Sequence, residues 1–153
     1  TDDCYGYRVY DGLHVAMKMK PQSAKAKGRA LQKWACIKIA ELVGLEWGRD
    51  KPIESRPMGQ RGVDVRLDDE AIARFPFSVE CKFQERWSIP EWIDQAKVNK
   101  KDGTNWLLIC KQSRKPPVVV MDAEAFFEML KWNRNGQGSV SSRPENEELG
   151  GSR

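Results

Sequence analysis

Histidine and closely spaced cysteine are nearly absent from this sequence. Its single histidine, His14, cannot form a histidine metal cluster, and it leaves serine and cysteine hydrolase triads without a credible base. The cysteines also lack the Cys-x-x-Cys spacing of zinc and iron–sulfur sites, so we expect reduced thiols. They are Cys4, Cys36, Cys81 and Cys110.

Long apolar runs, a signal-peptide pattern and a strong excess of one charge are missing as well. No stretch approaches the ~18 apolar residues of a membrane span, so we expect a cytosolic protein with no membrane partner. Lys and Arg total 26 and Asp and Glu total 22, and the resulting charge of +4 supports nucleic-acid binding only weakly. The glycine-rich phosphate loop of nucleoside triphosphatases is also absent.

The remaining patterns predict one folded domain between two less regular ends. A chain of 153 residues is long enough to bury one core. Residues 1–19 carry no clear helical pattern, and we interpret them as an N-terminal extension of uncertain structure. Residues 20–132 hold the helix and strand patterns, whereas residues 133–153, rich in Asn, Gly, Ser and Glu, predict a disordered polar tail.

Helix and strand patterns alternate within this domain. Apolar residues at helical spacing predict helices, and short alternating or apolar runs predict strands. The predicted helices cover 24–43, ended by Gly44, then 90–100, preceded by a capping box of Ser88 and Glu91, and a segment capped by Asp122. The predicted strands cover 53–56, 63–67, 77–84, 105–111 and 118–121, with a short helical or turn insertion at 68–75. The order α-β-β-β-α-β-β-α predicts an α/β fold with a central mixed β-sheet flanked by helices.

Charged residues interrupt two of the predicted strands. Residues i and i+2 share a face of a strand, so Glu80 and Lys82 point to one side together, and Asp64 lies between two valines on the preceding strand. If these strands pair, two carboxylates and an ammonium group meet. Oxygen ligands from Asp64, Glu80 and the Cys81 backbone carbonyl suit Mg²⁺, and Lys82 is placed to orient or deprotonate a water. These groups suit phosphodiester hydrolysis.

A surface hairpin with a cross-strand pair of lysine and carboxylate is the alternative interpretation of the same residues. Such a pair contributes only ~0.2–1 kcal/mol. It is disfavoured because Phe77, Val79 and Phe83 make one face of the second strand strongly apolar.

The motif of Asp64 followed by Glu80-Cys81-Lys82 resembles the signature of the PD-(D/E)XK nuclease superfamily. Within it, residues 20–130 are most similar to small phage-encoded members and archaeal-type Holliday-junction resolvases. The resemblance implies a restriction-endonuclease-like core and a metal-dependent endonuclease that uses Mg²⁺, with Mn²⁺ as a possible substitute. It also implies that Asp64, Glu80 and the Cys81 carbonyl hold the metal and that Lys82 is catalytic.

Two glutamines extend the resemblance. Family members often carry a glutamate four residues after a basic glycine turn, where this chain has Gln32. A neutral amide cannot replace a carboxylate as a strong metal ligand, but it can bind a water or a phosphate. Gln95 resembles a glutamine found in the helix after the Glu-x-Lys strand. The alternative for both is a solvated helix residue.

Basic and glycine-rich segments supply the predicted DNA contacts. Residues 55–62 are similar to the family's Ser/Gly-rich loop, although a simple connector is the alternative. The predicted DNA-binding residues are Lys25, Lys27, Arg29, Ser55, Arg56, Arg61 and Lys97. Trp87, Trp92 and Trp106 are expected to pack in the core or, alternatively, to stack on bases.

The resemblance implies a homodimeric resolvase that acts on branched DNA in the cytosol of a prokaryotic host, because a symmetric junction calls for two sites related by a twofold axis. Candidate interface residues are Trp92, Ile93, Trp106, Phe126, Phe127 and Met129. The alternatives are a restriction, repair or exonucleolytic enzyme with the same catalytic strands, or an inactive DNA-binding module, which Gln32 makes conceivable.

Overall fold

The computed structural model describes residues 23–57 and 61–136, with side chains described as far as residue 132. It divides into two compact units, one that ends at Asp122 and one that begins at Ala123. The predictions for residues 1–19 and 137–153 lie outside the described residues. No helix in the described ranges is long and apolar enough to cross a membrane.

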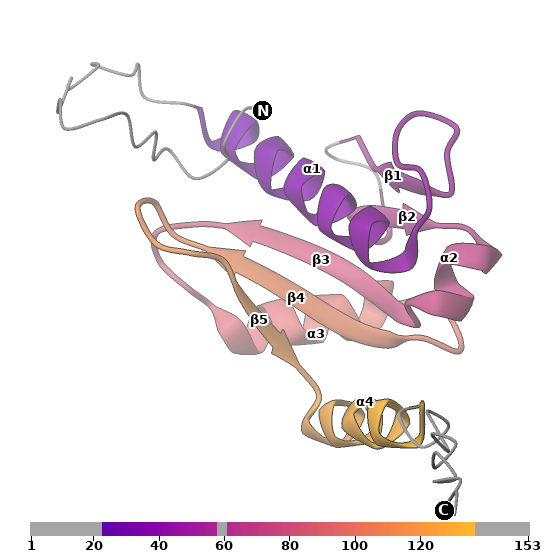
Figure 1. Cartoon of the computed structure of the whole chain (residues 1–153). Helices are drawn as coiled ribbons and strands as arrows, with labels where there is room; N and C mark the ends of the chain where they lie inside the picture. Colours follow the sequence, from indigo (N-terminus) through magenta and orange to yellow (C-terminus); the bar gives the residue numbers. More distant parts are fainter. Residues whose placement is uncertain (1–22, 58–60, 137–153) are drawn as a thin grey trace, which may run out of the picture. The chain divides into compact units, whose positions relative to one another are not determined.

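A five-stranded mixed sheet forms the first unit, so the predicted α/β class is confirmed (Figure 1). Its spatial order follows the sequence, and only β3 and β4 are parallel; the other neighbours are antiparallel. The strands are β1 (Ile53–Ser55), β2 (Val65–Leu67), β3 (Phe77–Phe83), β4 (Asn105–Lys111) and β5 (Val118–Met121). The parallel pair is joined by a helical crossover, as such pairs require.

The helix α1 (Ala24–Val43) has the predicted bounds because both ends carry local stop signals. Ser23 Oγ accepts a hydrogen bond of 3.2 Å from the Ala26 N–H, which satisfies one of the free amides at the helix start. Gly44 ends the helix with φ at 70°, a conformation that glycine adopts without steric cost. The stripe of Leu31, Ala35 and Ile39 is buried at four-residue spacing.

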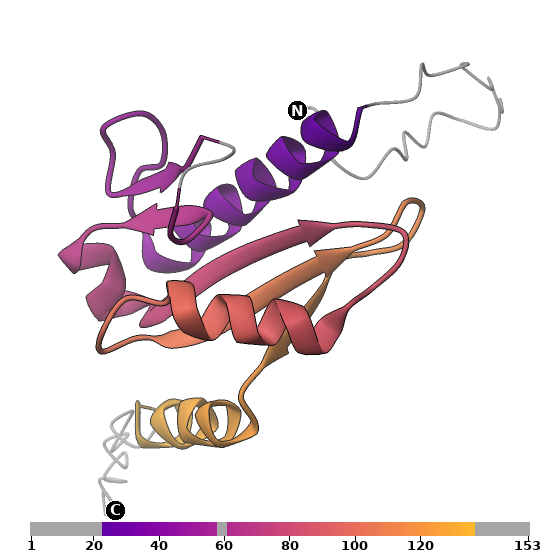
Figure 2. The same ribbon diagram turned by 180° about the vertical axis from the view of Figure 1, so that it is seen from behind.

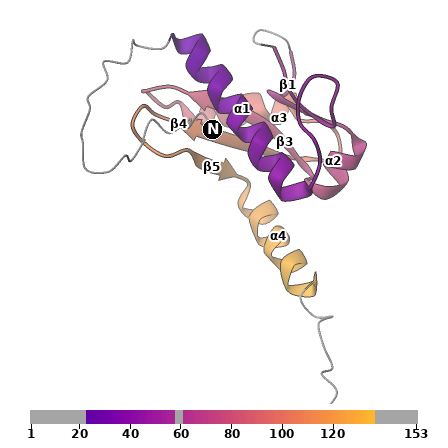
Figure 3. The ribbon, with the colours of Figure 1, turned by 45° about the horizontal axis from the view of Figure 1, so that its top comes forward.

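Two helices cover opposite faces of the sheet. Figure 2 shows α3 (Ile89–Asn99) in front of the strands, and Figure 3 shows α1 crossing over them on the other side. Alternation along β3 matches this arrangement: the Phe83 ring lies 5.4 Å from Lys27 Nζ of α1, while Lys82 binds Gln95 of α3. The short helix α2 (Asp69–Arg74), capped by Asp68, contacts β2 and fills the predicted insertion.

The apolar core between α3 and the sheet contains two of the residues predicted for a dimer interface. Trp92 and Trp106 are buried together with Leu108 and Cys110, and Ile93 packs against this cluster. The prediction that Trp92 and Trp106 form an intersubunit surface is therefore wrong, since their apolar area is already covered within one chain. The same burial removes them as base-stacking residues.

Two further details differ from the sequence predictions. Ser88 precedes α3 but makes no capping hydrogen bond, because its φ of −116° and ψ of 67° are not the extended geometry of a cap. The strand β2 begins at Val65, so Asp64 immediately precedes the strand rather than lying within it. The described cysteines, Cys36, Cys81 and Cys110, are free thiols, as predicted.

The second unit contains α4 (Ala123–Gly136). The predicted disorder from residue 133 is wrong for residues 133–136, which α4 contains; helix elongation adds one backbone hydrogen bond for each residue fixed. The rings of Phe126 and Phe127 lie 5.5 Å apart and are exposed, as is Leu130.

Candidate active site

Asp64 lies just before β2 and is hydrogen-bonded to the backbone of β3. Its N–H donates to the Val79 carbonyl at 3.1 Å, and its Oδ2 accepts the Cys81 N–H at 2.7 Å. Burial raises the pKa of the Asp64 carboxyl above its ordinary value, while the Cys81 N–H, Lys82 and Arg56 act to lower it. Asp64 is therefore fixed by the backbone of the strand that carries the Glu-x-Lys motif.

Glu80 is a buried carboxylate with one unsatisfied oxygen. The residue is only 4% exposed, and its Oε1 lies 3.4 Å from Lys82 Nζ. Its Oε2 has no hydrogen-bond partner within the described part of the chain. Burial and the nearby Asp64 charge raise the pKa of Glu80, and Lys82 and the Asn99 amide only partly oppose this. Such a group needs a cation or a proton to offset its buried charge.

Lys82 joins the carboxylate site to α3. Its Nζ donates to Gln95 Oε1 at 2.7 Å, in addition to the contact with Glu80, and its side chain is 15% exposed. An ammonium group held by two acceptors and still partly open to solvent is placed to contact a water near the carboxylates. Gln95 thus holds Lys82, although the glutamine is otherwise exposed to solvent.

The Cys81 carbonyl points to the same edge of β3 as Asp64. Backbone N–H and C=O groups of one strand residue lie on one side, and the Cys81 N–H reaches the Asp64 carboxylate. The ladder with β2 has its only residue pair at Val65 and Val79, so Cys81 lies past it. Burial raises the pKa of the Cys81 thiol well above its ordinary value, which keeps the thiol protonated and leaves the carbonyl as its available ligand.

These groups fit a divalent cation with oxygen ligands. Two carboxylates have raised pKa values, and one of their buried oxygens has no partner among the residues that the structure describes, so a cation would stabilise the site. Within the described ranges, no group of three or more His, Cys, Asp and Glu side chains is arranged for a metal. Divalent cations that keep several waters can bind a site with so few protein oxygen ligands.

Gln32 lies against β1 and, unlike Gln95, is only 3% exposed, so the solvated-residue alternative is wrong for it. Its Oε1 accepts a hydrogen bond of 2.9 Å from the Ser55 hydroxyl. This bond joins two predicted site residues to each other on the α1 side of the sheet.

The predicted DNA-binding residues fall into two groups. Lys27 is engaged within the protein, since its Nζ donates to Ser113 Oγ at 2.9 Å and lies over the Phe83 ring. Arg56 Nη1 donates to the Arg61 carbonyl, and the guanidinium lies directly over Gly62, where a Cβ atom would come within 2.5 Å of it. The other basic side chains predicted to contact DNA are exposed: Lys25, Arg29, Arg61 and Lys97.

Sequence reasoning missed Asn99, which lies at the end of α3 and acts on Glu80. Gln95 and Asn99 are four residues apart and therefore share a helix face. That spacing, on a helix already predicted to follow the Glu-x-Lys strand, is the signal that indicates a second polar residue beside the site.

An acidic residue at the start of one strand, and Glu-x-Lys on its antiparallel neighbour in a mixed sheet with helices on both faces, define the PD-(D/E)XK nuclease class. The sequence model of the family described as "Phage putative PDDEXK endonuclease" matches residues 24–143, and the chain belongs to that family. Members of this class generally use divalent metal ions, and their substrate is DNA. Searches of curated proteins and of solved structures found no significant match.

Proposed function

We propose that this nuclease is a metal-dependent endonuclease of branched DNA, with Asp64, Glu80 and the Cys81 carbonyl as the ligands of Mg²⁺ or Mn²⁺. The observation that carries the proposal is the buried Glu80 Oε2, which has no hydrogen-bond partner among the described residues and lies near Asp64, whose carboxyl pKa is raised by burial. A bound dication would offset both charges, neutralise charge that develops on the phosphate and activate water.

The remaining side chains have separable roles in this proposal. Lys82 hydrogen-bonds the attacking water and aligns it with the scissile phosphate. Gln95 restricts the Lys82 ammonium through their 2.7 Å hydrogen bond, which favours one orientation of Lys82. Gln32 and Ser55 brace β1 through their hydrogen bond, so Gln32 acts here as a positioning residue instead of a ligand.

The finer part of the proposal is a homodimeric Holliday-junction resolvase. Cutting two symmetric strands calls for two sites related by a twofold axis. Exposed Phe126, Phe127 and Leu130 on α4 supply apolar area for such an interface. Basic residues Lys25, Arg29, Arg61 and Lys97 would contact phosphates, and the site of action would be the cytosol of the phage's host.

A comparison of substrates tests this proposal. A labelled four-way junction, a matched linear duplex, a splayed arm and single-stranded DNA are incubated with the protein and Mg²⁺ at one salt concentration, because phosphate contacts make binding salt-dependent. We expect the junction to be cut fastest, in symmetrically related strands. Equal cleavage of all four would overturn the resolvase assignment but keep the nuclease, and cleavage of none with either Mg²⁺ or Mn²⁺ would overturn the enzyme.

An inactive DNA-binding module is the second candidate, favoured by the neutral Gln32 at a position where the family often has glutamate. It predicts tight binding of DNA without cleavage in either metal. Gln32→Glu separates the two candidates: cleavage gained only by the variant would assign the natural chain to binding alone.

A further inference from the structure

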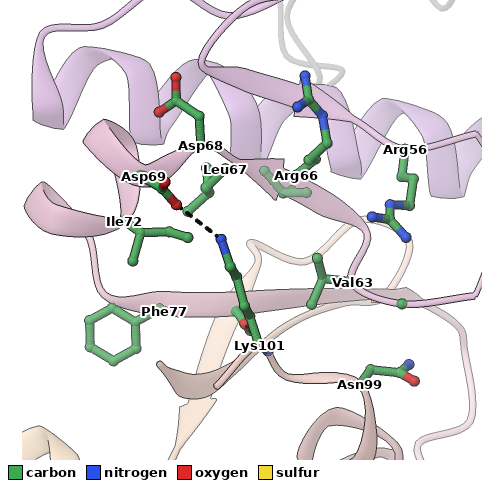
Figure 4. Close-up of a pocket in the computed structure, with 13 residues that line it drawn as sticks. Arg56, Val63, Arg66, Leu67, Asp68, Asp69, Ile72, Phe77, Asn99 and Lys101 are labelled. Atoms are coloured by element: carbon green, nitrogen blue, oxygen red, sulfur yellow. Dashed lines mark hydrogen bonds and ion pairs between the residues drawn. The ribbon is translucent and has the colours of Figure 1, made fainter. Parts of the chain in front are cut away.

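A pocket of about 420 Å³ opens between β2, α2, the start of β3 and the end of α3. Figure 4 shows Lys101 extending through its middle, with Ile72 and Phe77 on one side and Arg56 and Asn99 on the other. Pockets of this volume accommodate small organic groups rather than single ions. The proposed metal site, which binds ions, therefore does not by itself give this pocket a function.

Two residues that line the pocket also act on the carboxylate site. Arg56 lines it and also acts electrostatically on Asp64, and Asn99 lines it and acts on Glu80. The backbone around Lys101 is fixed to β3, because the Lys101 N–H donates to Ser78 Oγ at 2.9 Å. A group in the pocket would therefore lie next to whatever the carboxylates bind.

The pocket is lined by cationic and apolar side chains and, at the start of α2, by Asp68 and Asp69. Cationic groups come from Arg56 and Lys101, whereas Val63, Ile72 and Phe77 contribute apolar surface. Lys101 Nζ is bound at 3.2 Å to Asp69 Oδ1, but the Asp69 side chain is fully exposed, and an exposed ion pair of this kind is weak and exchangeable. A phosphate needs cations and no apolar wall, while a nucleotide uses both.

We propose that this pocket binds one unpaired nucleotide of the DNA strand that the carboxylate site cuts, with Lys101 and Arg56 on its phosphate and the apolar wall against its base. The inference rests on the proposed DNA endonuclease activity and narrows its substrate. A base stacked and paired within a duplex cannot enter, and extrusion costs least where stacking is already broken, as at a branch point. The pocket would thereby select branched or gapped DNA.

The test uses the full chain and two labelled DNAs in Ca²⁺, in place of the catalytic metal, at one salt concentration. One DNA is a matched duplex, and the other carries a single unpaired 2-aminopurine nucleotide at a branch. Ile72→Trp fills the pocket, and Ala73→Trp places the same side chain on the next, exposed residue of α2, outside it. Affinity is measured by anisotropy, and base environment by 2-aminopurine fluorescence.

We expect Ile72→Trp to weaken binding of the branched DNA about tenfold and to abolish the change in 2-aminopurine fluorescence, while duplex binding stays the same. Ala73→Trp should match the natural protein with both DNAs. If Ile72→Trp does not fold, Lys101→Ala is tested instead, with Lys38→Ala on the exposed face of α1 as its control. We expect Lys101→Ala to lower the DNA-binding affinity several-fold, and more for the branched DNA than for the duplex. Lys38→Ala should bind both DNAs as the natural protein does.

Unchanged affinity and fluorescence in a folded Ile72→Trp or in Lys101→Ala would overturn the pocket assignment, as would an equal loss with both DNAs. These outcomes are independent of cleavage. A natural protein that cuts no DNA in Mg²⁺ or Mn²⁺ would overturn the proposed enzyme, yet the binding measurements in Ca²⁺ would still support or reject the nucleotide pocket.

Discussion

Ser78 and Glu80 lie two residues apart on the same face of β3 and are buried to nearly the same extent, at 6% and 4% exposure. The two side chains differ in how many of their polar atoms have hydrogen-bond partners. The Ser78 hydroxyl lies 2.7 Å from Thr104 Oγ1 and accepts the Lys101 N–H, while Thr104 Oγ1 donates to the Lys101 carbonyl at 2.6 Å. Glu80 keeps one oxygen without a partner in the described part of the chain.

The difference separates a structural polar site from a functional one. A buried polar group that is fully hydrogen-bonded can stabilise the fold, and the bonds around Thr104 fasten the turn after α3 onto β3. A buried carboxylate without a full set of partners destabilises the metal-free fold instead. The unpartnered oxygen of Glu80 is explained best by a ligand that the protein binds. The hydrogen bonds of Ser78 show that this strand can provide a buried polar side chain with partners from the protein itself.

The largest expected effect comes from variants of the functional site around Glu80. Asp64→Asn and Lys82→Ala should each lower the cleavage rate at least ~100-fold, because each removes a group that acts on the phosphate or on water. The measurement is single-turnover cleavage of a labelled junction in Mg²⁺. Asp94→Asn, on the exposed surface of α3, is the matched control and should cut at the natural rate. Equal rates for all four proteins would place the active site elsewhere.

Thr104→Val disrupts the structural polar site, because it removes the hydroxyl that links Ser78 to the turn after α3. The free energy of unfolding should fall by about 1–3 kcal/mol, since the buried Ser78 hydroxyl and the partly buried Lys101 carbonyl each lose one hydrogen-bond partner. Urea denaturation followed by tryptophan fluorescence measures it. Cleavage by the folded variant at low temperature should stay within a few-fold of the natural rate, and a loss as large as that of Lys82→Ala would show that this network also serves the chemistry.

A smaller effect is expected at Gln95, which holds Lys82 without touching Glu80 in the described contacts. Gln95→Leu should slow cleavage about tenfold and leave the free energy of unfolding within ~0.5 kcal/mol, because the residue is exposed apart from this bond. Rate and stability are measured on the same preparation. A rate equal to that of the natural protein would make Gln95 a bystander.

The smallest effect is a dependence of stability on pH in the metal-free protein. The pKa values of Asp64 and Glu80 are raised in the folded state above 3.8 and 4.5, so the native state holds protons that the unfolded chain releases. Their contribution to stability is present below those ordinary values and is lost as pH rises through the folded pKa values. Melting in a chelator should show this decline, and Glu80→Gln should flatten it; an identical profile for the variant would contradict the raised pKa.

Local signals made much of the fold predictable from the sequence. Both ends of α1 are set by neighbouring residues, Ser23 and Gly44, and the strand after Asp64 and the strand that carries Glu80 are recognisable from their apolar residues. The spacing of Glu80 and Lys82 by two residues fixes their common face in any strand. These features need no information from distant parts of the chain.

Features that depend on tertiary contacts were not predictable in the same way. The sequence shows that Trp92 and Trp106 are apolar but does not show that α3 buries them against β4, and it therefore left them available for an interface. Asn99 reaches Glu80 only because the turn after α3 is fastened to β3. The pairing of Gln32 with Ser55 likewise joins residues 23 positions apart.

The central claim is that Glu80 and Asp64 bind a divalent cation, and thermal unfolding with and without Mn²⁺ tests it most directly. A ligand at 100 times its Kd stabilises the folded state by ~2.7 kcal/mol, so saturating Mn²⁺ should raise the melting temperature of the natural protein and of Thr104→Val by several degrees at neutral pH. Glu80→Gln should show almost no rise, although it melts no lower than the natural protein in a chelator. An equal Mn²⁺ shift in Glu80→Gln, or none in the natural protein, would contradict the account.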